Sequence, residues 1–265
     1  MNQTELLYGY NSLLITAMLF IAILIFNEFG FRIGRYVQVS TDDEIKSLTG
    51  SIQASILGLL ALLLGFTFSM SMQRFDNRSL AAISEANAIG TTSLRLQLLP
   101  ETYQSRAKLL MAEYIELRIS VGQVDMTRSK ERREYNQRIA ALQDAIWAVA
   151  IEAAQEDPRP VTSGAFITAL NDMIDNQGRR NALLQMHVPE VVLLLLFTVF
   201  IASGAMLGYS SGLGGKRVVA PTVMVSFLIA MIVFIIIDLD RPRRGLIQVN
   251  QGSMLELSQS TSARN

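Results

Sequence analysis

The chain has no cysteine and a single histidine, His187, among its 265 residues. Without cysteine there can be no disulfide, iron–sulfur cluster or thiolate zinc site, and one histidine excludes a multi-histidine metal centre within one chain. Charge is also scarce, because Asp, Glu, Lys and Arg make up 17 % of the residues, whereas a soluble domain usually carries about a quarter. Acidic and basic residues balance at 23 each, which argues against a large nucleic-acid interface. We therefore predict no metal, no cofactor and no nucleic-acid partner, and a surface that largely faces lipid.

Half of the residues are hydrophobic, and many of them gather in four runs that contain no charged residue. The runs lie between Glu5 and Glu28, Lys46 and Arg74, Glu190 and Lys216, and Arg217 and Asp238. Each run has about 20 residues or more, enough for a helix to cross a hydrocarbon core roughly 30 Å thick, and lipid offers no partner for unpaired backbone groups. The first run lacks the basic start and the small-residue cleavage site of a signal peptide. The sequence predicts an all-α membrane protein with two transmembrane helices in 1–73 and two more in 188–245.

The interval 74–187 is polar and has helical periodicity, which predicts a helical domain inserted between the second and third spans. Its apolar residues recur at steps of three and four in two stripes: Leu109, Ala112, Ile115 and Ile119, then Ile139, Leu142, Ile146 and Ala150. The segment "DPRP" is expected to end the second of these helices, and "TSGAF" to begin another. No strand followed by a glycine-rich loop and a helix is present, so a nucleotide site of that kind has no support.

Small polar residues interrupt the otherwise strong helical pattern after the second span. They are expected to mark close packing or a solvated face of the helix, with an inter-helix or inter-subunit contact through Glu85 and Asn87 as the alternative. These small polar residues are Asn87, Gly90, Thr91 and Thr92. Residues 246–265 are predicted to form a C-terminal tail whose polar end, "SQSTSARN", is disordered.

Basic residues near the span ends indicate the orientation in the membrane. With four spans, both termini and the insert share one side, and this side has seven such residues against five on the other. The seven are Arg74, Arg78, Arg179, Arg180, Arg241, Arg243 and Arg244, and the five are Arg32, Arg35, Lys46, Lys216 and Arg217. The bias predicts a multi-pass membrane protein with a cytoplasmic insert and cytoplasmic termini.

The second span has two contrasting faces when it is wound as a helix. Small residues, Ala54, Gly58, Ala61 and Gly65, fall on one face and would let neighbouring helices approach closely. The opposite face carries Ile56, Leu59, Leu63, Phe66 and Met70, followed by Arg74. One interpretation is a packing helix within a bundle. The other is a pore helix, in which the large apolar residues form a constriction that gates by dewetting and Arg74 supplies positive charge at the pore mouth.

The fourth span is followed at once by a cluster of charge: Asp238, Asp240, Arg241, Arg243 and Arg244. Pro242 disfavours helix at the residue before it, so the span is expected to end near Asp240. The acids lie at the negative end of the helix dipole and need partners, which the arginines could supply while also meeting anionic headgroups. The cluster is either a membrane-exit anchor or a clamp that holds the tail to the insert or to a neighbouring subunit.

Four segments of the chain resemble the bacterial four-span bestrophin-like family, over about residues 50–249. They are "LGFTFSMSMQRFDNRSLAAISEANAIG", "LLPE", "ALNDMIDNQGRRNALLQMHVPEVV" and "DLDRPRRGLIQV". That family is distantly similar to true bestrophins, which are pentameric anion channels whose second span lines the pore and whose helical insert is cytosolic. The segment "QRFDNRSL" is similar to the stretch after the bestrophin pore helix, where paired aromatic residues stand in place of the lone Phe75.

Three functions follow as hypotheses. The resemblance and the second span favour a homo-oligomeric channel, implied to be a pentamer, for small anions. The alternative is a non-conducting membrane scaffold whose insert binds a cytoplasmic partner, and in both cases the partners include lipid and further copies of the chain. An intramembrane enzyme is disfavoured, because the spans hold no paired carboxylates and His187 has no nearby Ser or Asp placed for nucleophilic chemistry.

Overall fold

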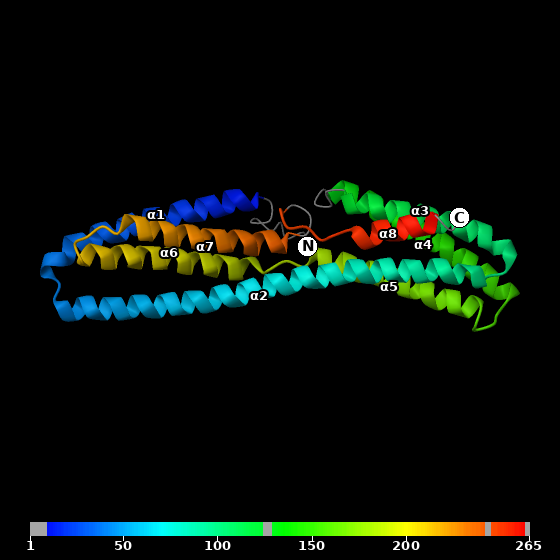
Figure 1. The fold of residues 1–265 in the computed structure, drawn as a ribbon, viewed down its shortest axis with the longest axis horizontal. Helices are drawn as coiled ribbons and strands as arrows, with labels where there is room; N and C mark the ends of the chain where they lie inside the picture. Colours follow the sequence, from blue (N-terminus) through cyan, green and yellow to red (C-terminus); the bar gives the residue numbers. More distant parts are fainter. Residues whose placement is uncertain (1–9, 124–128, 242–244, 263–265) are drawn as a thin grey trace. The chain divides into compact units, whose positions relative to one another are not determined.

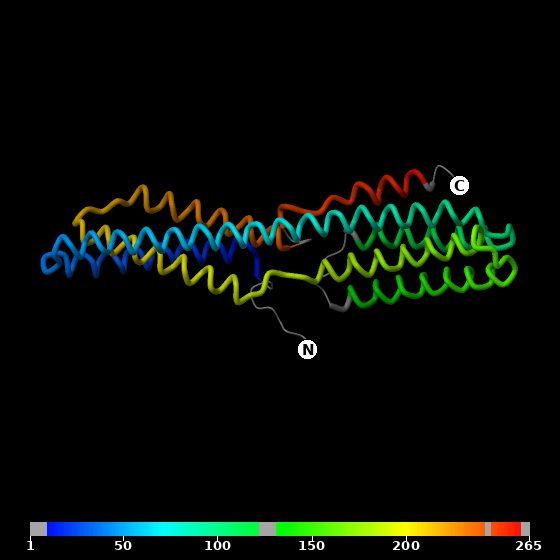
Figure 2. The backbone as a smooth tube through the Cα atoms, turned by 90° about the horizontal axis from the view of Figure 1, so that it is seen from below, coloured from blue at the N-terminus to red at the C-terminus, as the bar shows by residue number. Residues whose placement is uncertain are grey.

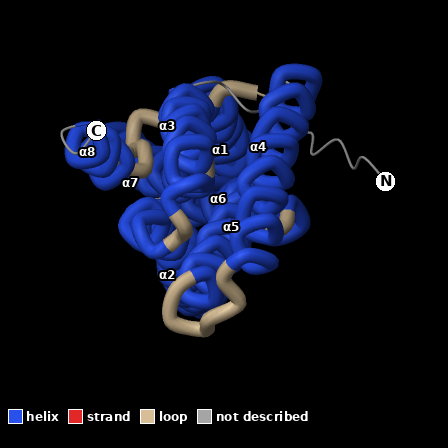
Figure 3. Tube along the Cα trace, turned by 90° about the vertical axis from the view of Figure 1, so that its right-hand side faces the viewer, coloured by secondary structure: helices blue, strands red, loops and turns tan. Residues whose placement is uncertain are grey.

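The computed structural model describes residues 10–123, 129–241 and 245–262, and every regular element in these ranges is helical (Figure 3). In chain order the elements are α1 (Ser12–Val37), η2 (Gln38–Ser40), α2 (Asp43–Arg95), η3 (Leu96–Leu98), α3 (Glu101–Gln123), α4 (Ser129–Glu156), α5 (Ser163–Gln185), α6 (Glu190–Leu213), α7 (Val219–Asp240) and α8 (Gly252–Ser262). The all-α prediction is confirmed.

The chain divides into two compact units. Unit 1 comprises Met1–Arg74, His187–Arg241 and Gly245–Ile247, and unit 2 comprises Phe75–Met186, Pro242–Arg244 and Gln248–Asn265. The helix α2 contributes to both, since it runs without a break through the boundary at Arg74. At 1.5 Å per residue its 53 residues measure about 80 Å. A hydrocarbon core is roughly 30 Å thick, so much of α2 must lie outside it.

Unit 1 holds the apolar helices. Among the described residues, four helical segments are long and apolar enough to cross a membrane, and they lie within Ser12–Ser40, Asp43–Leu98, Ser163–Leu213 and Val219–Asp240. α1 packs along both α6 and α7 (Figures 1 and 2). Their shared core contains Ile15, Leu19, Ile23, Leu60, Leu196, Phe200, Val233 and Ile237. The four predicted spans are therefore present as helices.

The backbones of α1 and α6 touch through glycines. A Cβ atom at Gly30 would overlap the carbonyl oxygen of Ala205, and one at Gly208 would overlap that of Asn27. The amide of Asn27 donates to the carbonyl of Gly204 at 3.0 Å. Small residues at an interface allow this approach where lipid provides no hydrophobic force between helices. We conclude that the glycines of α6 serve helix packing.

Unit 2 has its own core, formed by the end of α2 together with α3, α4, α5 and α8. The apolar stripe predicted on α4 is confirmed, because Ile139, Leu142, Ile146 and Ala150 are all buried. The stripe predicted on α3 is wrong at Leu109, whose side chain is 75 % exposed. The buried face of α3 is centred instead on Ala107, Met111, Tyr114 and Ile115. A helix of this composition offers two overlapping apolar stripes, and the position of its neighbours selects one.

The small polar residues after the second span lie within α2, which continues through Asn87 to Arg95. Thr92 is closely packed, since its hydroxyl donates to the carbonyls of Ala88 and of Ala169 in α5, and Asn87 is exposed. The predicted disorder of the tail is wrong as far as Ser262, where α8 ends, and residues 263–265 lie outside the described residues. Met254 of α8 is buried in the core of unit 2, so tertiary packing supplies the stability that the polar sequence lacks.

Candidate functional site

The side of α2 that faces away from α1, α6 and α7 is apolar and open. Leu59 is 52 % exposed and Phe66 is 65 % exposed. A Cβ atom at Gly58 or Gly65 would meet nothing within 4 Å, so the glycines of the small-residue stripe have no close neighbour within the part of the chain that the structure describes. Two surfaces of α2, one with large apolar side chains and one with small residues, are thus available to further copies of the chain or to lipid.

The other residues predicted for the pore face pack against neighbouring helices of the same chain. Ile56 is half-buried, Leu63 packs against the core that contains Phe200, and Met70 packs against the cluster of Val188, Leu193 and Ile236. The five apolar residues of the predicted constriction therefore divide into an exposed pair and a packed set. The predicted face is broad, and the neighbouring helices cover only one edge of it.

The basic residues near the end of the second span lie on the side of α2 that is packed against other parts of the chain. Arg74 is half-buried and lies one turn after the fully buried Ser71. The buried Arg78 donates to the carbonyls of Leu183 and Met186 at 3.2 and 2.5 Å. These two carbonyls lie at the C-terminal end of α5, where backbone acceptors have no helical partner and the dipole favours a cation. Arg78 thereby caps α5, a role that sequence spacing did not reveal.

The charge cluster after the fourth span begins where expected, since α7 ends at Asp240 and Arg241 is extended, with φ −100° and ψ 99°. The carboxylate of Asp238 accepts from the hydroxyl of Ser12 at 3.4 Å and from the backbone N–H of Ile247 at 2.9 Å. Gly245 is required beside it, because a Cβ atom there would lie 2.7 Å from the carboxylate. Asp238 thus joins the starts of α1 and of the segment after α7 to the end of α7.

Asp240 makes a second junction. Its carboxylate accepts from the backbone N–H of Val188 at 2.7 Å and lies 3.8 Å from Nδ1 of His187, just before α6 begins. Asp238, Asp240 and Arg241 are all at most 5 % exposed. Their burial and these partners give the three residues contacts within unit 1, and the choice between a membrane-exit anchor and a clamp stays a prediction. The predicted members Arg243 and Arg244 lie outside the described residues.

Unit 2 contains a buried charge cluster, of which the sequence predicted only a contact through Glu85. The Glu85 carboxylate accepts from Arg118 and from Arg180, each at 2.5 Å, and Arg180 also donates to the side chain of Gln251 at 2.9 Å. Burial disfavours the charged form of Arg118, but the adjacent Glu85 carboxylate outweighs this and raises the pKa of the guanidinium. The expected inter-helix contact of Glu85 is confirmed, whereas Asn87 is exposed.

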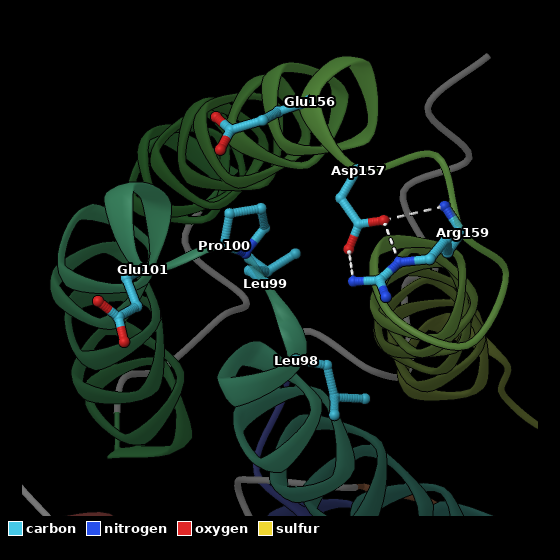
Figure 4. A pocket seen from close by; sticks show the side chains of 7 residues that line it. All are labelled: Leu98, Leu99, Pro100, Glu101, Glu156, Asp157 and Arg159. Atoms are coloured by element: carbon cyan, nitrogen blue, oxygen red, sulfur yellow. Dashed lines mark hydrogen bonds and ion pairs between the residues drawn. The ribbon is translucent and has the colours of Figure 1, made fainter.

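A surface pocket of about 510 Å³ lies in unit 2, where η3, the start of α3 and the end of α4 meet (Figure 4). Three acids line it, Glu101, Glu156 and Asp157, with one base, Arg159. Arg159 bonds both oxygens of Asp157 and holds the pKa of that carboxyl below its usual value. Excess negative charge makes this pocket unsuited to an anion. Within the described ranges, no group of three His, Asp or Glu side chains is placed to hold a metal ion.

The helical order, the four spans and the inserted unit agree with one known family. The Bestrophin-like domain matches residues 20–254. The chain belongs to the Bestrophin-like family. The resemblance noted in the sequence is confirmed, and the chain is a membrane protein of this family. A search of curated proteins gave no match.

Solved structures share the fold of this Bestrophin-like chain. A bacterial Bestrophin homolog from Klebsiella pneumoniae, solved by zinc phasing, superposes with a TM-score of 0.63 and 17 % identity, over 95 % of this chain and 96 % of that one. A single-substitution variant of the same homolog gives a TM-score of 0.66 and 15 % identity, over 93 % and 97 %. At this identity the likeness shows the fold alone.

Proposed function

We propose that this Bestrophin-like protein is a homo-oligomeric ion channel of the bacterial inner membrane, with the second span around the axis and small anions as the permeant species. The observation that carries the proposal is the surface of α2 that the other helices of the chain leave uncovered. Among the four candidate spans, the one in α2 is the least buried within the protomer and has the lowest mean hydropathy. We infer that further subunits, or a pore, cover much of this least buried and least apolar span.

The same face supports a particular lining. Leu59 and Phe66 are exposed, and Leu62, which lies between them, is 54 % exposed. Residues spaced by three and four follow one another along one face of a helix, so copies around an axis would stack three apolar rings. Such rings form a constriction that gates by dewetting. Ile56, Leu63 and Met70 would support this lining from behind through their packing.

The subunit number and the orientation belong to the same proposal. The resemblance implies a pentamer, and the excess of basic residues on one side supports a cytoplasmic insert and termini. Arg74 stays a proposed source of positive potential near the mouth, acting from the packed side of α2. We propose no catalytic activity and no cofactor.

Planar-bilayer recording of the purified protein tests the channel directly. Leu59→Ala and Phe66→Ala should raise the open-state current, since a wider and less apolar ring lowers the dewetting barrier. Leu195→Ala is a matched control, because Leu195 on α6 is 52 % exposed, as is Leu59, and it should leave the current unchanged. Silence of the wild-type protein, or equal effects of all three variants, would refute the proposal.

The scaffold alternative draws less support. Its motivation was the apolar stripes of the insert, and the α4 stripe is buried in the core of unit 2. A stoichiometric foreign partner in pull-downs from native membranes, together with silent bilayers, is the result that would favour a scaffold.

A further inference from the structure

Three arginines converge on a pocket in unit 1 that plays no part in the proposed pore. Arg32, Arg35 and Arg217 line a surface pocket of about 440 Å³ together with Phe31. Arg32 and Arg35 come from the last turns of α1, and Arg217 comes from the turn between α6 and α7. Residues far apart in the chain thus bring three like charges together, an arrangement that costs free energy unless an anion offsets it.

Internal contacts hold two of the guanidinium groups in place. Arg35 donates to the carbonyl of Gly215 at 2.8 Å, in a turn that depends on glycine because φ of Gly215 is 69°. The guanidinium of Arg217 lies over the ring of Phe31, 4.5 Å from its centroid, a favourable cation–π distance. These anchors preorganise the cations, so less rotamer freedom is lost when a ligand binds.

One carboxylate offsets part of this charge. Glu28 accepts from Nε of Arg32 at 2.9 Å and from Nη2 of Arg217 at 3.1 Å. Its single negative charge faces three positive ones. Each guanidinium has five N–H donors, and the side chains of Arg32 and Arg217 are still 75 % and 56 % exposed. The pocket therefore has a net positive charge and donors directed to solvent, and Glu28 occupies part of the place that an outside anion would take.

Exposed apolar residues close in the chain to the lining residues indicate where this anion comes from. Phe29, Ile33 and Tyr36 lie on α1 beside Arg32 and Arg35 in sequence, Val218 and Val219 directly follow Arg217, and all five are exposed. Amphipathic tyrosine at the end of a span is typical of the headgroup level of a bilayer. Binding of an aqueous anion would bury none of this exposed apolar surface, whereas the acyl chains of a lipid can cover it.

We propose that this pocket binds the phosphate of an anionic phospholipid headgroup, with Arg32, Arg35 and Arg217 as donors and Glu28 as a competing internal acceptor. The planar fork of arginine matches two phosphate oxygens at once. Free phosphate shares this chemistry, and the experiment separates the two sources. The proposal requires only that the protein lies in a membrane, so it stands or falls independently of conduction.

Native mass spectrometry of the full-length protein in detergent measures the binding of phosphatidylglycerol, of phosphatidylcholine and of inorganic phosphate. Phosphatidylglycerol should bind more tightly than the other two. Arg32→Gln and Arg217→Gln should each weaken it by about fivefold or more, the worth of one arginine near an anionic surface. Lys46→Gln is the matched control, because Lys46 is paired with Asp43 and is not among the residues that line the pocket.

Glu28→Gln separates binding from a structural role. Removing the internal competitor should tighten phosphatidylglycerol binding. If Glu28 only held the arginines in place, the loss of its two ion pairs would instead weaken phosphatidylglycerol binding. Lipid-free melting temperatures check that each variant is folded. Equal binding of phosphatidylglycerol and phosphatidylcholine overturns the proposal. So does weaker phosphatidylglycerol binding by Glu28→Gln than by the wild type, or equal phosphatidylglycerol binding by Arg32→Gln and Lys46→Gln. Inorganic phosphate that binds as tightly as phosphatidylglycerol overturns the lipid assignment.

Discussion

Replacing Glu85 by glutamine tests what the buried charge cluster contributes to unit 2. The substitution keeps the size and shape of the side chain and removes one negative charge. Arg118 and Arg180 would then face the same neutral amide, and both are at most 3 % exposed. Nη1 of Arg118 is buried and has no hydrogen-bond partner, so this guanidinium has little left to offset its charge.

The expected cost follows from that burial. Removing one partner of a buried ion pair destabilises a protein by about 3–5 kcal/mol, because it leaves an uncompensated charge in a medium of low dielectric. Two arginines depend on Glu85, which favours the upper part of this range. A typical domain is stable by about 5–15 kcal/mol, so Glu85→Gln should remove a third or more of the stability of unit 2.

Trp147 provides the assay. It is the single tryptophan of the chain and packs against the core of unit 2, so its fluorescence reports the unfolding of that unit alone. Guanidinium chloride titration of wild type and Glu85→Gln gives the two midpoints. Glu152→Gln is the control, since it breaks the exposed pair with Arg106, and exposed pairs contribute little.

A second variant distinguishes charge from packing. Changing Glu85 to Leu together with Arg118→Met and Arg180→Met should recover most of the lost stability, because apolar residues of similar volume often replace buried ion pairs without loss. Gln251 would lose its partner, which limits the recovery. A Glu85→Gln midpoint no lower than that of Glu152→Gln would show that the reasoning about the cluster is wrong.

Three further predictions concern other parts of the molecule. Gly208→Leu should abolish the correctly folded protein in size-exclusion chromatography, because its side chain would overlap the backbone at Asn27, whereas Gly50→Leu, at an open position, should not. Asp240→Ala should lower stability by about 1–3 kcal/mol in thermal unfolding, since it removes the carboxylate that accepts from the buried N–H of Val188; an unchanged melting temperature would show that this contact contributes no stability. Burial raises the pKa of Tyr114 to about 12, so the folded state keeps the proton that the unfolded state loses at about pH 10. The stabilisation should be complete below about pH 10 and lost as the pH rises through about 12, and Tyr114→Phe should remove this part of the alkaline loss.

The sequence alone determined the class of protein and much of the local structure. Runs of about 20 apolar residues without charge can be satisfied in only one way in lipid, as helices, so the spans could be identified without knowing what surrounds them. The same holds for the end of α7, because Pro242 restricts the residue before it whatever the tertiary context. The periodicity of α4 also predicted its buried face, since that helix has one dominant apolar stripe.

Tertiary structure decided which surfaces meet. Leu109 and Ile115 share one predicted stripe, yet Leu109 is exposed and Ile115 buried, because the positions of neighbouring helices choose between overlapping faces. The same selection divides the predicted pore residues of α2 into the exposed Leu59 and Phe66 and the packed Leu63 and Met70. Burial against residues distant in the chain is a property of the whole fold, and a pattern within one helix cannot encode it.

The charged clusters show the same limit for polar residues. Asp238 and Asp240 are predicted to pair with nearby arginines, of which Arg243 and Arg244 lie outside the described residues. The structure adds partners such as Ser12 and Val188, which lie 226 and 52 positions away along the chain. A buried carboxylate takes whichever donors the fold brings within hydrogen-bond distance, backbone N–H groups included. The pocket of Arg32, Arg35 and Arg217 arises in the same way: each arginine is visible in the sequence, but only the approach of α1 to the α6–α7 turn makes them one site.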